Sequence, residues 1–292
     1  MSAPVQREAS TDAFEFVREL ATELTTGDIE LPSFPEVAAQ VQKVLSQDDS
    51  DSARVVRVLG AEPMLATRVL SMANAAALNP GGKSVSDLRT AVTRLGFDSL
   101  RSAAIGFAMA QIQRAKQFKG IERHLSALWQ QSVLVAALAF VVARRTDKAS
   151  PDTAMLTGLV HGVGKLYILT HSTKHPALFG EQEMYQRIVH DWHGNIAKAL
   201  LEGWYMAEEI VIAVHSFEDQ SRELRGVAGA LADVLDVADM LSACKDDPDS
   251  VPALLVGRKA VIRLGLDAEI CQSLLVESGE ELAALRDALG HN

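Results

Sequence analysis

The chain is predicted to fold as an all-α protein. Apolar residues recur three and four positions apart over most of the 292 residues, which is the period of an amphipathic helix. The strict alternation of apolar and polar residues that marks a half-buried strand is nearly absent. Aromatic residues, which are common in strands, make up only 5% of the chain.

The first two expected helices lie before residue 46. One begins after Ser10 or Thr11 and is ended by Gly27 and Asp28. Its expected apolar face consists of Phe14, Val17, Leu20, Ala21 and Leu24. Pro35 suits the first turn of the next helix, because a backbone N–H at that position has no partner within the helix.

Three more helices are expected before residue 110. Pro63 begins the first of them. Ser86 is expected to be the N-cap of the second, with the Asp87 carboxylate at the positive end of the helix dipole. Gly96 ends that helix, and Asp98 caps the one that follows.

The second half of the chain continues the helical pattern. The apolar run Val133–Ala143 is about half the ~20 residues needed to span a bilayer, and we expect it to be a buried core helix. Ser150–Asp152 supplies a cap, a proline and a first-turn carboxylate for the helix that carries His161. Further helices are expected over Val227–Leu241 and Asp267–Leu275.

Composition limits the classes of function. The formal net charge of -10 argues against non-specific binding to nucleic acid or to an anionic membrane. The two cysteines, Cys244 and Cys271, allow at most one disulfide and show no zinc-knuckle spacing. Residues Met1–Ser10 contain no apolar segment of a secretory signal. A cytoplasmic protein that binds neither nucleic acid nor membrane is expected.

The segment Leu159–Lys165 is similar to a metal-binding motif that has lost its carboxylate. Intact, the motif reads His-Asp, a small apolar residue, then Gly-Lys. Imidazole nitrogen and carboxylate oxygen bind Zn, Fe or Mn at about 2.0–2.2 Å, and a carboxylate can bridge two ions. Gly162 occupies the carboxylate position and has no side chain with which to bind a metal.

Five segments, in order, resemble the signature blocks of the HDOD family, the HD-related output domains of bacterial signalling proteins. The opening Leu-Pro-x-Leu-Pro block of the family corresponds to Leu31-Pro32-Ser33-Phe34-Pro35. The other blocks correspond to Glu62–Asn74, Val85–Gly96, Trp129–Ser132 and His193–Trp204. Together they cover roughly residues 29–225.

The resemblance implies an N-terminal helical lobe packed on a lobe like that of HD-superfamily phosphohydrolases. We expect an N-terminal helical extension over residues 1–28, an HDOD domain over 29–225 and a C-terminal helical extension over 226–292. Within the domain, residues 29–117 form the first lobe and 118–225 the HD-like lobe. The role of the C-terminal extension and the oligomeric state stay open.

The resemblance also implies which residues line the former metal site. The first histidine of the superfamily site falls at Gln131, the His-Asp pair at His161 and Gly162, and a later histidine at His193. Asp239 matches the late aspartate of the superfamily. At most His161, His193 and Asp239 survive as ligands, so we expect no metal and no other cofactor.

Lys165 and the remaining histidines are placed by local reasoning. Lys165 is expected to pair locally here, whereas in an active relative it would face a phosphate. His215 lies two residues before the His-His position of the family, which on a helix turns it to another face. His171 and His175 have the spacing of a helical metal pair, but Pro176 biases His175 away from helical geometry, which favours a surface turn.

The sequence therefore favours a non-enzymatic signal-transduction module with a decayed phosphohydrolase site. It would act by binding a signalling protein, such as a sensor kinase, a receiver domain or a cyclic-dinucleotide enzyme. A docking surface for an acidic partner is suggested by arginines of the first lobe, namely Arg54, Arg57, Arg68, Arg89, Arg94 and Arg101. Two alternatives stay open, a residual metal-dependent phosphodiesterase and a nucleotide sensor that uses the vestigial pocket.

Overall fold

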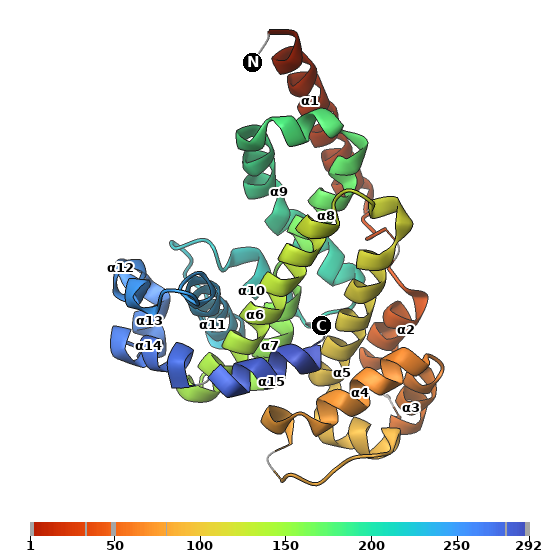
Figure 1. The fold of residues 1–292 in the computed structure, drawn as a ribbon, viewed down its shortest axis with the longest axis vertical. Helices are drawn as coiled ribbons and strands as arrows, with labels where there is room; N and C mark the ends of the chain where they lie inside the picture. Colours follow the sequence, from red (N-terminus) through yellow and green to blue (C-terminus); the bar gives the residue numbers. More distant parts are fainter. Residues whose placement is uncertain (1–2, 33, 48–50, 80, 278, 290–292) are drawn as a thin grey trace.

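The computed structural model confirms the all-α class. It describes residues 3–32, 34–47, 51–79, 81–277 and 279–289, and these contain helices and turns but no strand. The ends of two expected extensions, residues 1–2 and 290–292, lie outside the described residues. The molecule is elongated, with the N-terminal helix projecting at one end and the first lobe at the other (Figure 1).

The helices follow one another in three groups. The N-terminal helix and first lobe contain α1 (Ala3–Thr26), α2 (Glu36–Leu45), α3 (Ser52–Gly60), α4 (Pro63–Asn74) and α5 (Leu88–Arg114). The second lobe contains α6 (Glu122–Thr146), α7 (Pro151–Val160), α8 (Val163–His171), α9 (Gln182–Gly203), α10 (Glu208–Ser216) and α11 (Gly226–Ala243). The C-terminal group contains α12 (Val251–Leu255), α13 (Lys259–Leu264), α14 (Ala268–Glu277) and α15 (Gly279–Leu289). Short 3₁₀ turns are η1 (Ala76–Leu78), η2 (Lys116–Phe118), η3 (Ser172–Lys174), η4 (Pro176–Gly180) and η5 (Pro248–Ser250).

The expected start of the first helix is wrong, and its expected apolar face is wrong at Phe14. Helix α1 begins at Ala3, because Pro4 sits in its first turn, where its missing N–H costs nothing. The side chain of Phe14 is 70% exposed, whereas Ala13, Phe16 and Leu20 are buried. The packed face therefore keeps Val17, Leu20 and Leu24 of the expected stripe and adds Ala13 and Phe16. Gly27 ends the helix with a positive φ of 77°, as expected.

The helix boundaries of the first lobe lie close to the expected ones, with shifts of one residue. Pro35 is the N-cap of α2 and not a residue of its first turn. Pro63 is the first residue of α4, as predicted. The N-cap of α5 is Asp87 rather than Ser86, because the Asp87 carboxylate accepts a hydrogen bond from the Thr90 N–H at 2.8 Å. Gly96 adopts a φ of 72° and breaks α5 into two helical halves. A residue with a side chain would be strained in that conformation.

Helix α6 is the central core helix of the second lobe, as predicted. Every residue from 132 to 143 is buried. By length and composition α6 could cross a membrane, but 72% of its most apolar window is buried inside the fold. It packs against α5, α7, α8, α11 and α15, so neighbouring helices cover its apolar surface. The packing of a protein core accounts for its apolar composition.

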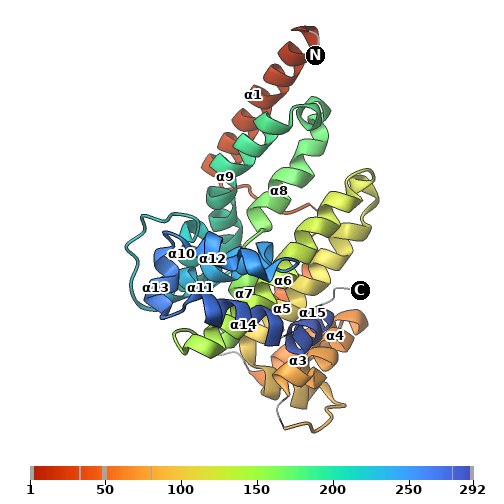
Figure 2. The same ribbon diagram turned by 60° about the vertical axis from the view of Figure 1, so that its left-hand side comes forward.

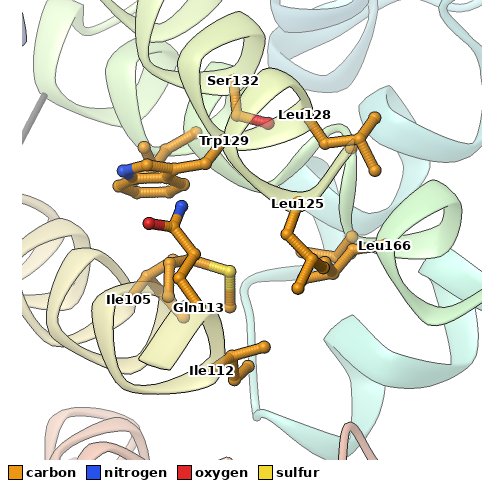
Figure 3. A pocket seen from close by; sticks show the side chains of 12 residues that line it. Ile105, Ile112, Gln113, Leu125, Leu128, Trp129, Ser132 and Leu166 are labelled. Atoms are coloured by element: carbon orange, nitrogen blue, oxygen red, sulfur yellow. The ribbon is translucent and has the colours of Figure 1, made fainter. Parts of the chain in front are cut away.

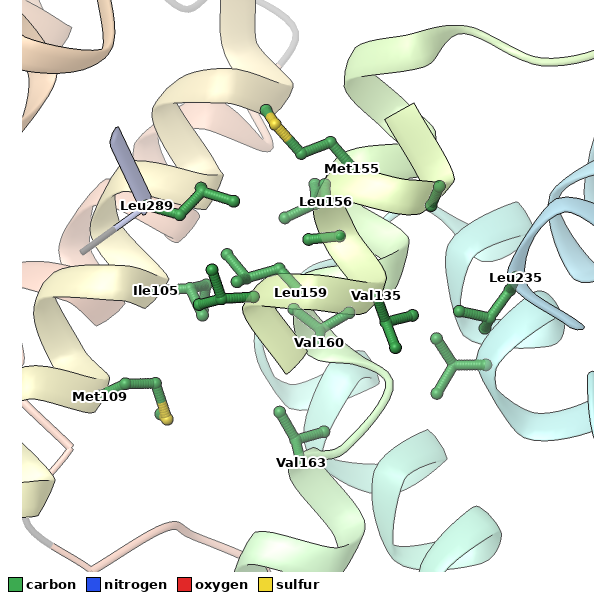
Figure 4. Packing of buried hydrophobic residues seen from close by; sticks show 14 of the residues in the cluster. Ile105, Met109, Val135, Met155, Leu156, Leu159, Val160, Val163, Leu235 and Leu289 are labelled. Carbon is green, nitrogen blue, oxygen red and sulfur yellow. The ribbon is translucent and has the colours of Figure 1, made fainter. Parts of the chain in front are cut away.

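A continuous hydrophobic core joins the two lobes. Helix α5 contacts α2, α3 and α4 on one side and α6 and α7 on the other. Figure 4 shows Ile105 of α5 beside Leu156 and Leu159 of α7, with Leu289 of α15 on the same side. All four side chains are buried. The lobes therefore share one core instead of being joined by a flexible hinge.

The helices after residue 225 have two different positions. Helix α11 packs against α6, α7 and α10, so in space it belongs to the second lobe. Helix α15 crosses α4, α5 and α6 near the C-terminus (Figures 1 and 2). The Arg68 guanidinium donates a 2.6 Å hydrogen bond to the Leu289 carbonyl at the end of α15. The last helix is thus anchored on the first lobe.

Three arginines of the expected docking surface donate hydrogen bonds to backbone carbonyls within the fold. Arg68 binds the end of α15, and the Arg101 guanidinium donates to the Leu45 carbonyl at 2.8 Å. Arg94 donates to the Lys83 carbonyl at 2.7 Å. The side chains of Arg101 and its carbonyl partner are buried, and burial lowers the pKa of Arg101. The predicted basic surface is therefore smaller than the sequence suggested, because these arginines satisfy backbone carbonyls.

Two glycines let helices approach at backbone distance. A Cβ atom at Gly158 of α7 would lie 2.7 Å from the Ala136 Cα of α6. A Cβ atom at Gly164 of α8 would lie 2.0 Å from the His193 carbonyl oxygen of α9. Only residues without a side chain permit such contacts, so these two positions set how α7 and α8 are placed.

Substitution of Gly164 by alanine is expected to force α8 and α9 apart. Because the clash is with a backbone oxygen, we expect a loss of about 3 kcal/mol in the free energy of unfolding, measured by urea denaturation. Gly203→Ala at the end of α9 is the control, since a Cβ there meets nothing within 4 Å. That variant should keep or slightly raise stability. Equal effects of the two substitutions would contradict the close-approach argument.

Candidate functional site

The candidate site lies where α7 gives way to α8. Helix α7 ends at Val160, so His161 is its C-cap and Gly162 is the residue before α8. The close contact of α7 with α6 sets His161 beside the second lobe's core, and α11 brings Asp239 to the same place. Sequence positions far apart are therefore assembled by the packing of α6, α7 and α11.

His161 is buried beside Asp239 and Phe217. Its side chain is 3% exposed, and its Nδ1 donates to the Gly158 carbonyl at 2.6 Å. Burial lowers the pKa of His161, against the opposing effect of the Asp239 carboxylate. The Nε2 atom lies 3.9 Å from Asp239 Oδ1, too far for a hydrogen bond. The ring of Phe217 meets the imidazole edge-on at 6.0 Å.

His193 and Lys165 converge on one carboxylate, that of Glu218. The Nε2 of His193 donates to Glu218 Oε2 at 3.0 Å, and Lys165 Nζ donates to Oε1 at 3.1 Å. The hydrogen bond from His193 is the main reason that the pKa of Glu218 falls to about 2, with Lys165 acting in the same direction. Glu218 is therefore ionised at neutral pH and holds both donors.

The side-chain amide of Gln131 is hydrogen-bonded to Ser242. Its Nε2 donates to the Ser242 hydroxyl at 2.6 Å, and that hydroxyl donates to the Asp239 carbonyl at 2.6 Å. The chain of hydrogen bonds links α6 to α11 beside His161. An amide in this position positions the backbone of α11 and is a weak ligand for transition metals.

Gly162 faces a small apolar space, which Figure 3 shows from close by. The cavity measures about 20 Å³, enough for one water molecule at most, and is lined mainly by apolar side chains. A Cβ atom at Gly162 would lie 2.9 Å from the Ser132 hydroxyl oxygen. The Gly162 backbone has φ -86° and ψ 2°, which other residues also adopt. Backbone conformation therefore does not require glycine here.

The residues present do not fit the two-metal centre of the superfamily. His161 and Asp239 offer two donor atoms 3.9 Å apart. Within the described residues, the metal-sized groups of three His, Cys, Asp or Glu donors do not include His161, His193 or Asp239. The Lys165 ammonium, bound to the same Glu218 carboxylate as His193, adds a positive charge that disfavours a further cation beside His193. We therefore derive no chemical step through a metal at this site.

The structure brings His161 within 3.9 Å of Asp239, and it brings His193 and Lys165 onto Glu218. Neither Glu218 nor Ser242 was among the residues expected at the site. Glu218 lies near the position of the His-His pair of the family. It was not considered as a site residue, because the family has no acidic ligand at that position. Ser242 carried no sequence signal. His215 does face elsewhere, with its Nε2 3.1 Å from Asn195 Oδ1.

The prediction that His175 lies in a surface turn is wrong. His175 does lie in a turn, between η3 and η4, with φ -125° as Pro176 requires. Its side chain is nevertheless buried, because α1 covers the turn. His171 stacks on Tyr167 with ring centroids 3.9 Å apart, so the two histidines do not form a pair.

A larger cavity of about 380 Å³ lies next to the site. Its lining comes from α6, α8 and α9 and consists of His124, Ala127, Leu128, Lys165, Leu169, Gln182, Tyr185, Gln186 and Val189. Lys165 thus borders both this cavity and Glu218. The volume is at the lower end of the range for small-ligand sites, about 300–1,000 Å³.

Comparison with known proteins assigns the family. The model of the HDOD domain matches residues 31–219, well over half of the chain. The chain therefore belongs to the HDOD family. A comparison with curated proteins gives no match.

Solved structures share the fold over nearly the whole chain. A protein of Shewanella amazonensis SB2B, named for a presumed metal-dependent phosphohydrolase activity, has a TM-score of 0.74 at 23% identity, covering 96% of this chain and 99% of its own. An HDOD domain protein of unknown function from Geobacter sulfurreducens has a TM-score of 0.65 at 25% identity, covering 93% and 97%. A presumed signal transduction protein of Marinobacter aquaeolei VT8 has a TM-score of 0.62 at 20% identity, covering 97% of this chain and 66% of its own. These likenesses confirm the predicted HD-like helical fold.

Replacement of Glu218 by glutamine should remove a pH-dependent stabilisation. The folded-state pKa of about 2 lies below the ordinary value of 4.5, so the stabilisation is present above pH 4.5 and is lost between pH 4.5 and 2. At pH 7 we expect a loss of about 1 kcal/mol in the free energy of unfolding, since the carboxylate is partly exposed. Urea unfolding at several pH values measures the difference between wild type and variant.

The control is Glu202→Gln, whose carboxylate makes only an exposed pair with Lys198 at 4.0 Å. It should change stability by a few tenths of a kcal/mol at any pH. A Glu218→Gln effect that did not shrink below pH 4.5 would contradict the account of this ion-pair cluster.

Proposed function

We propose that this HDOD protein is a cytoplasmic signalling module that acts by binding another protein and does not hydrolyse phosphate esters. The observation that supports this most directly is the cluster of Lys165, His193 and Glu218. His193, one of the three expected surviving ligands, is bound to the Glu218 carboxylate, and the Lys165 ammonium is bound to the same carboxylate. The negative charge of Glu218 is thus balanced by Lys165, a side chain of the protein, and not by a metal ion.

The family supports the regulatory part of the proposal. One structural relative is named as a presumed signal transduction protein, and the HDOD domain itself is related to HD proteins. The partner classes remain those suggested by the sequence, a sensor kinase, a receiver domain or a cyclic-dinucleotide enzyme. Of the arginines considered for docking, Arg54, Arg57 and Arg89 are exposed and would be available to an acidic partner.

If the protein were a metal-dependent phosphohydrolase, it would cleave phosphate esters when a divalent metal is added. Our proposal predicts that it does not. Metal-dependent hydrolysis needs an ion that lowers the pKa of bound water and holds the phosphate. We expect purified protein to cleave neither bis-p-nitrophenyl phosphate nor cyclic di-GMP faster than His161→Ala does, in the presence of Mn²⁺, Fe²⁺ or Zn²⁺. Turnover by wild type that is lost in His161→Ala would contradict the proposal.

A variant with restored ligands serves as the positive control. Gln131→His together with Gly162→Asp returns the two missing donors. The φ and ψ of Gly162 suit aspartate, and the Ser132 hydroxyl, 2.9 Å from the added Cβ, has to rotate in this variant and in its control alike. Gln131→His with Gly162→Asn has nearly the same shape without the carboxylate charge. If ligand loss emptied the site, Mn²⁺ affinity measured by calorimetry should be at least about tenfold higher in the aspartate variant. Equal affinity would show that another feature excludes the metal.

The second candidate function is nucleotide sensing without hydrolysis. It is favoured by the cavity of about 380 Å³, where the Lys165 ammonium borders an apolar space of suitable size. A bound phosphate would compete with Glu218 for Lys165.

Binding of cyclic di-GMP or ATP in this cavity would raise the melting temperature without added metal. The rise should disappear in Lys165→Met and persist in Lys198→Met, whose lysine is exposed on α9. No shift at millimolar nucleotide, or a shift unaffected by Lys165→Met, would eliminate sensing in this cavity.

A further inference from the structure

A second group of potential metal ligands lies where α1 covers the turn between α8 and α9. Asp12 and Glu15 are three residues apart on α1 and therefore share one face of the helix. His175 lies opposite them, in the turn between η3 and η4. Donor atoms of Asp12, Glu15 and His175 all lie within 4.8 Å of one another.

The imidazole of His175 is positioned by its surroundings. Its residue is 6% exposed, and its ring packs against Phe16 with centroids 5.1 Å apart. The Nε2 atom lies 3.1 Å from Glu19 Oε2. A histidine held by packing and by a neighbouring carboxylate loses little freedom when its ring binds a metal.

The carboxylates of this group lack cationic partners. Within the described residues, no lysine or arginine forms an ion pair with Asp12, Glu15 or Glu19. Asp12 accepts a weak hydrogen bond of 3.3 Å from the Ala177 N–H. Glu15 forms no hydrogen bond or ion pair with any described residue. Among the described residues, three acidic groups thus gather around one imidazole without a lysine or arginine bound to them.

We propose that Asp12, Glu15 and His175 bind one Zn²⁺ ion. Ligands bound to one ion at about 2.0–2.2 Å lie about 3–4 Å apart, so small side-chain rotations would bring these donors into place. A mixed set of imidazole and carboxylate suits Zn²⁺, and the same set binds Mn²⁺ more weakly and Mg²⁺ or Ca²⁺ poorly. Glu19 lies at hydrogen-bonding distance from the histidine and would orient it.

The ion would tie the N-terminal helix to the second lobe. Helix α1 packs on η4 and α9, and it projects beyond the rest of the molecule (Figures 1 and 2). The apolar part of that contact is limited to a few side chains, among them Phe16 and Leu20. A bound Zn²⁺ ion would add a second link between α1 and the turn that carries His175, and the strength of this link would depend on the zinc concentration. This site is separate from His161 and Asp239 and does not rest on the proposed signalling function.

The test is a zinc-binding measurement on untagged full-length protein. After dialysis against micromolar free Zn²⁺, mass spectrometry should find about one equivalent in wild type. His175→Ala should lose it. Glu15→Gln should weaken the affinity at least tenfold, and because Glu15 is exposed this variant keeps the fold. Glu183→Gln, an exposed glutamate of α9, and His161→Ala should bind as wild type does.

A thermal shift distinguishes the site from scattered surface binding. Saturating Zn²⁺ should raise the melting temperature of wild type and of Glu183→Gln, and not that of Glu15→Gln. Less than about a tenth of an equivalent in wild type would overturn the proposal. So would binding that is unchanged in both Glu15→Gln and His175→Ala, or binding that is lost in His161→Ala.

Discussion

The packing of α7 onto the central helix α6 is the contact on which the candidate site depends. At Gly158 the two backbones come so close that a Cβ atom would lie 2.7 Å from Ala136. This crossing fixes where α7 ends, and therefore where His161 lies. Helix α11 packs on the same α6, which brings Asp239 within 3.9 Å of the His161 imidazole. The residues of the site are thus brought together by the packing of neighbouring helices around the apolar helix α6.

The helical fold and the candidate site rest on different contacts. The HD-like arrangement persists because it rests on glycine contacts and a shared apolar core, neither of which uses a metal. A buried polar group without a hydrogen-bond partner is costly. Here Glu218 accepts from His193 and Lys165, while Ser242 accepts from Gln131. The polar groups are paired within the protein itself.

The helices could largely be predicted from the sequence, whereas the partners of the polar side chains at the candidate site could not. Helix starts at Pro63 and Ser150 follow from local chemistry, and the buried run Val133–Ala143 follows from composition. The role of Glu218 could not be predicted, because it depends on how α10 packs beside α9. The burial of His175 was missed for the same reason, since α1 covers it from far away in the sequence. Local signals specify helices, whereas the partners of a polar side chain are set by tertiary packing.

The most direct test of the account is a crystal structure of the protein soaked with Zn²⁺ and measured at the zinc absorption edge. The account predicts no anomalous density between His161 and Asp239, with the Lys165 ammonium still on Glu218 at about 3 Å. Strong anomalous density bound by His161, His193 and Asp239, with Lys165 displaced, would contradict it. That result would show that the site still holds a metal and that hydrolysis has to be reconsidered.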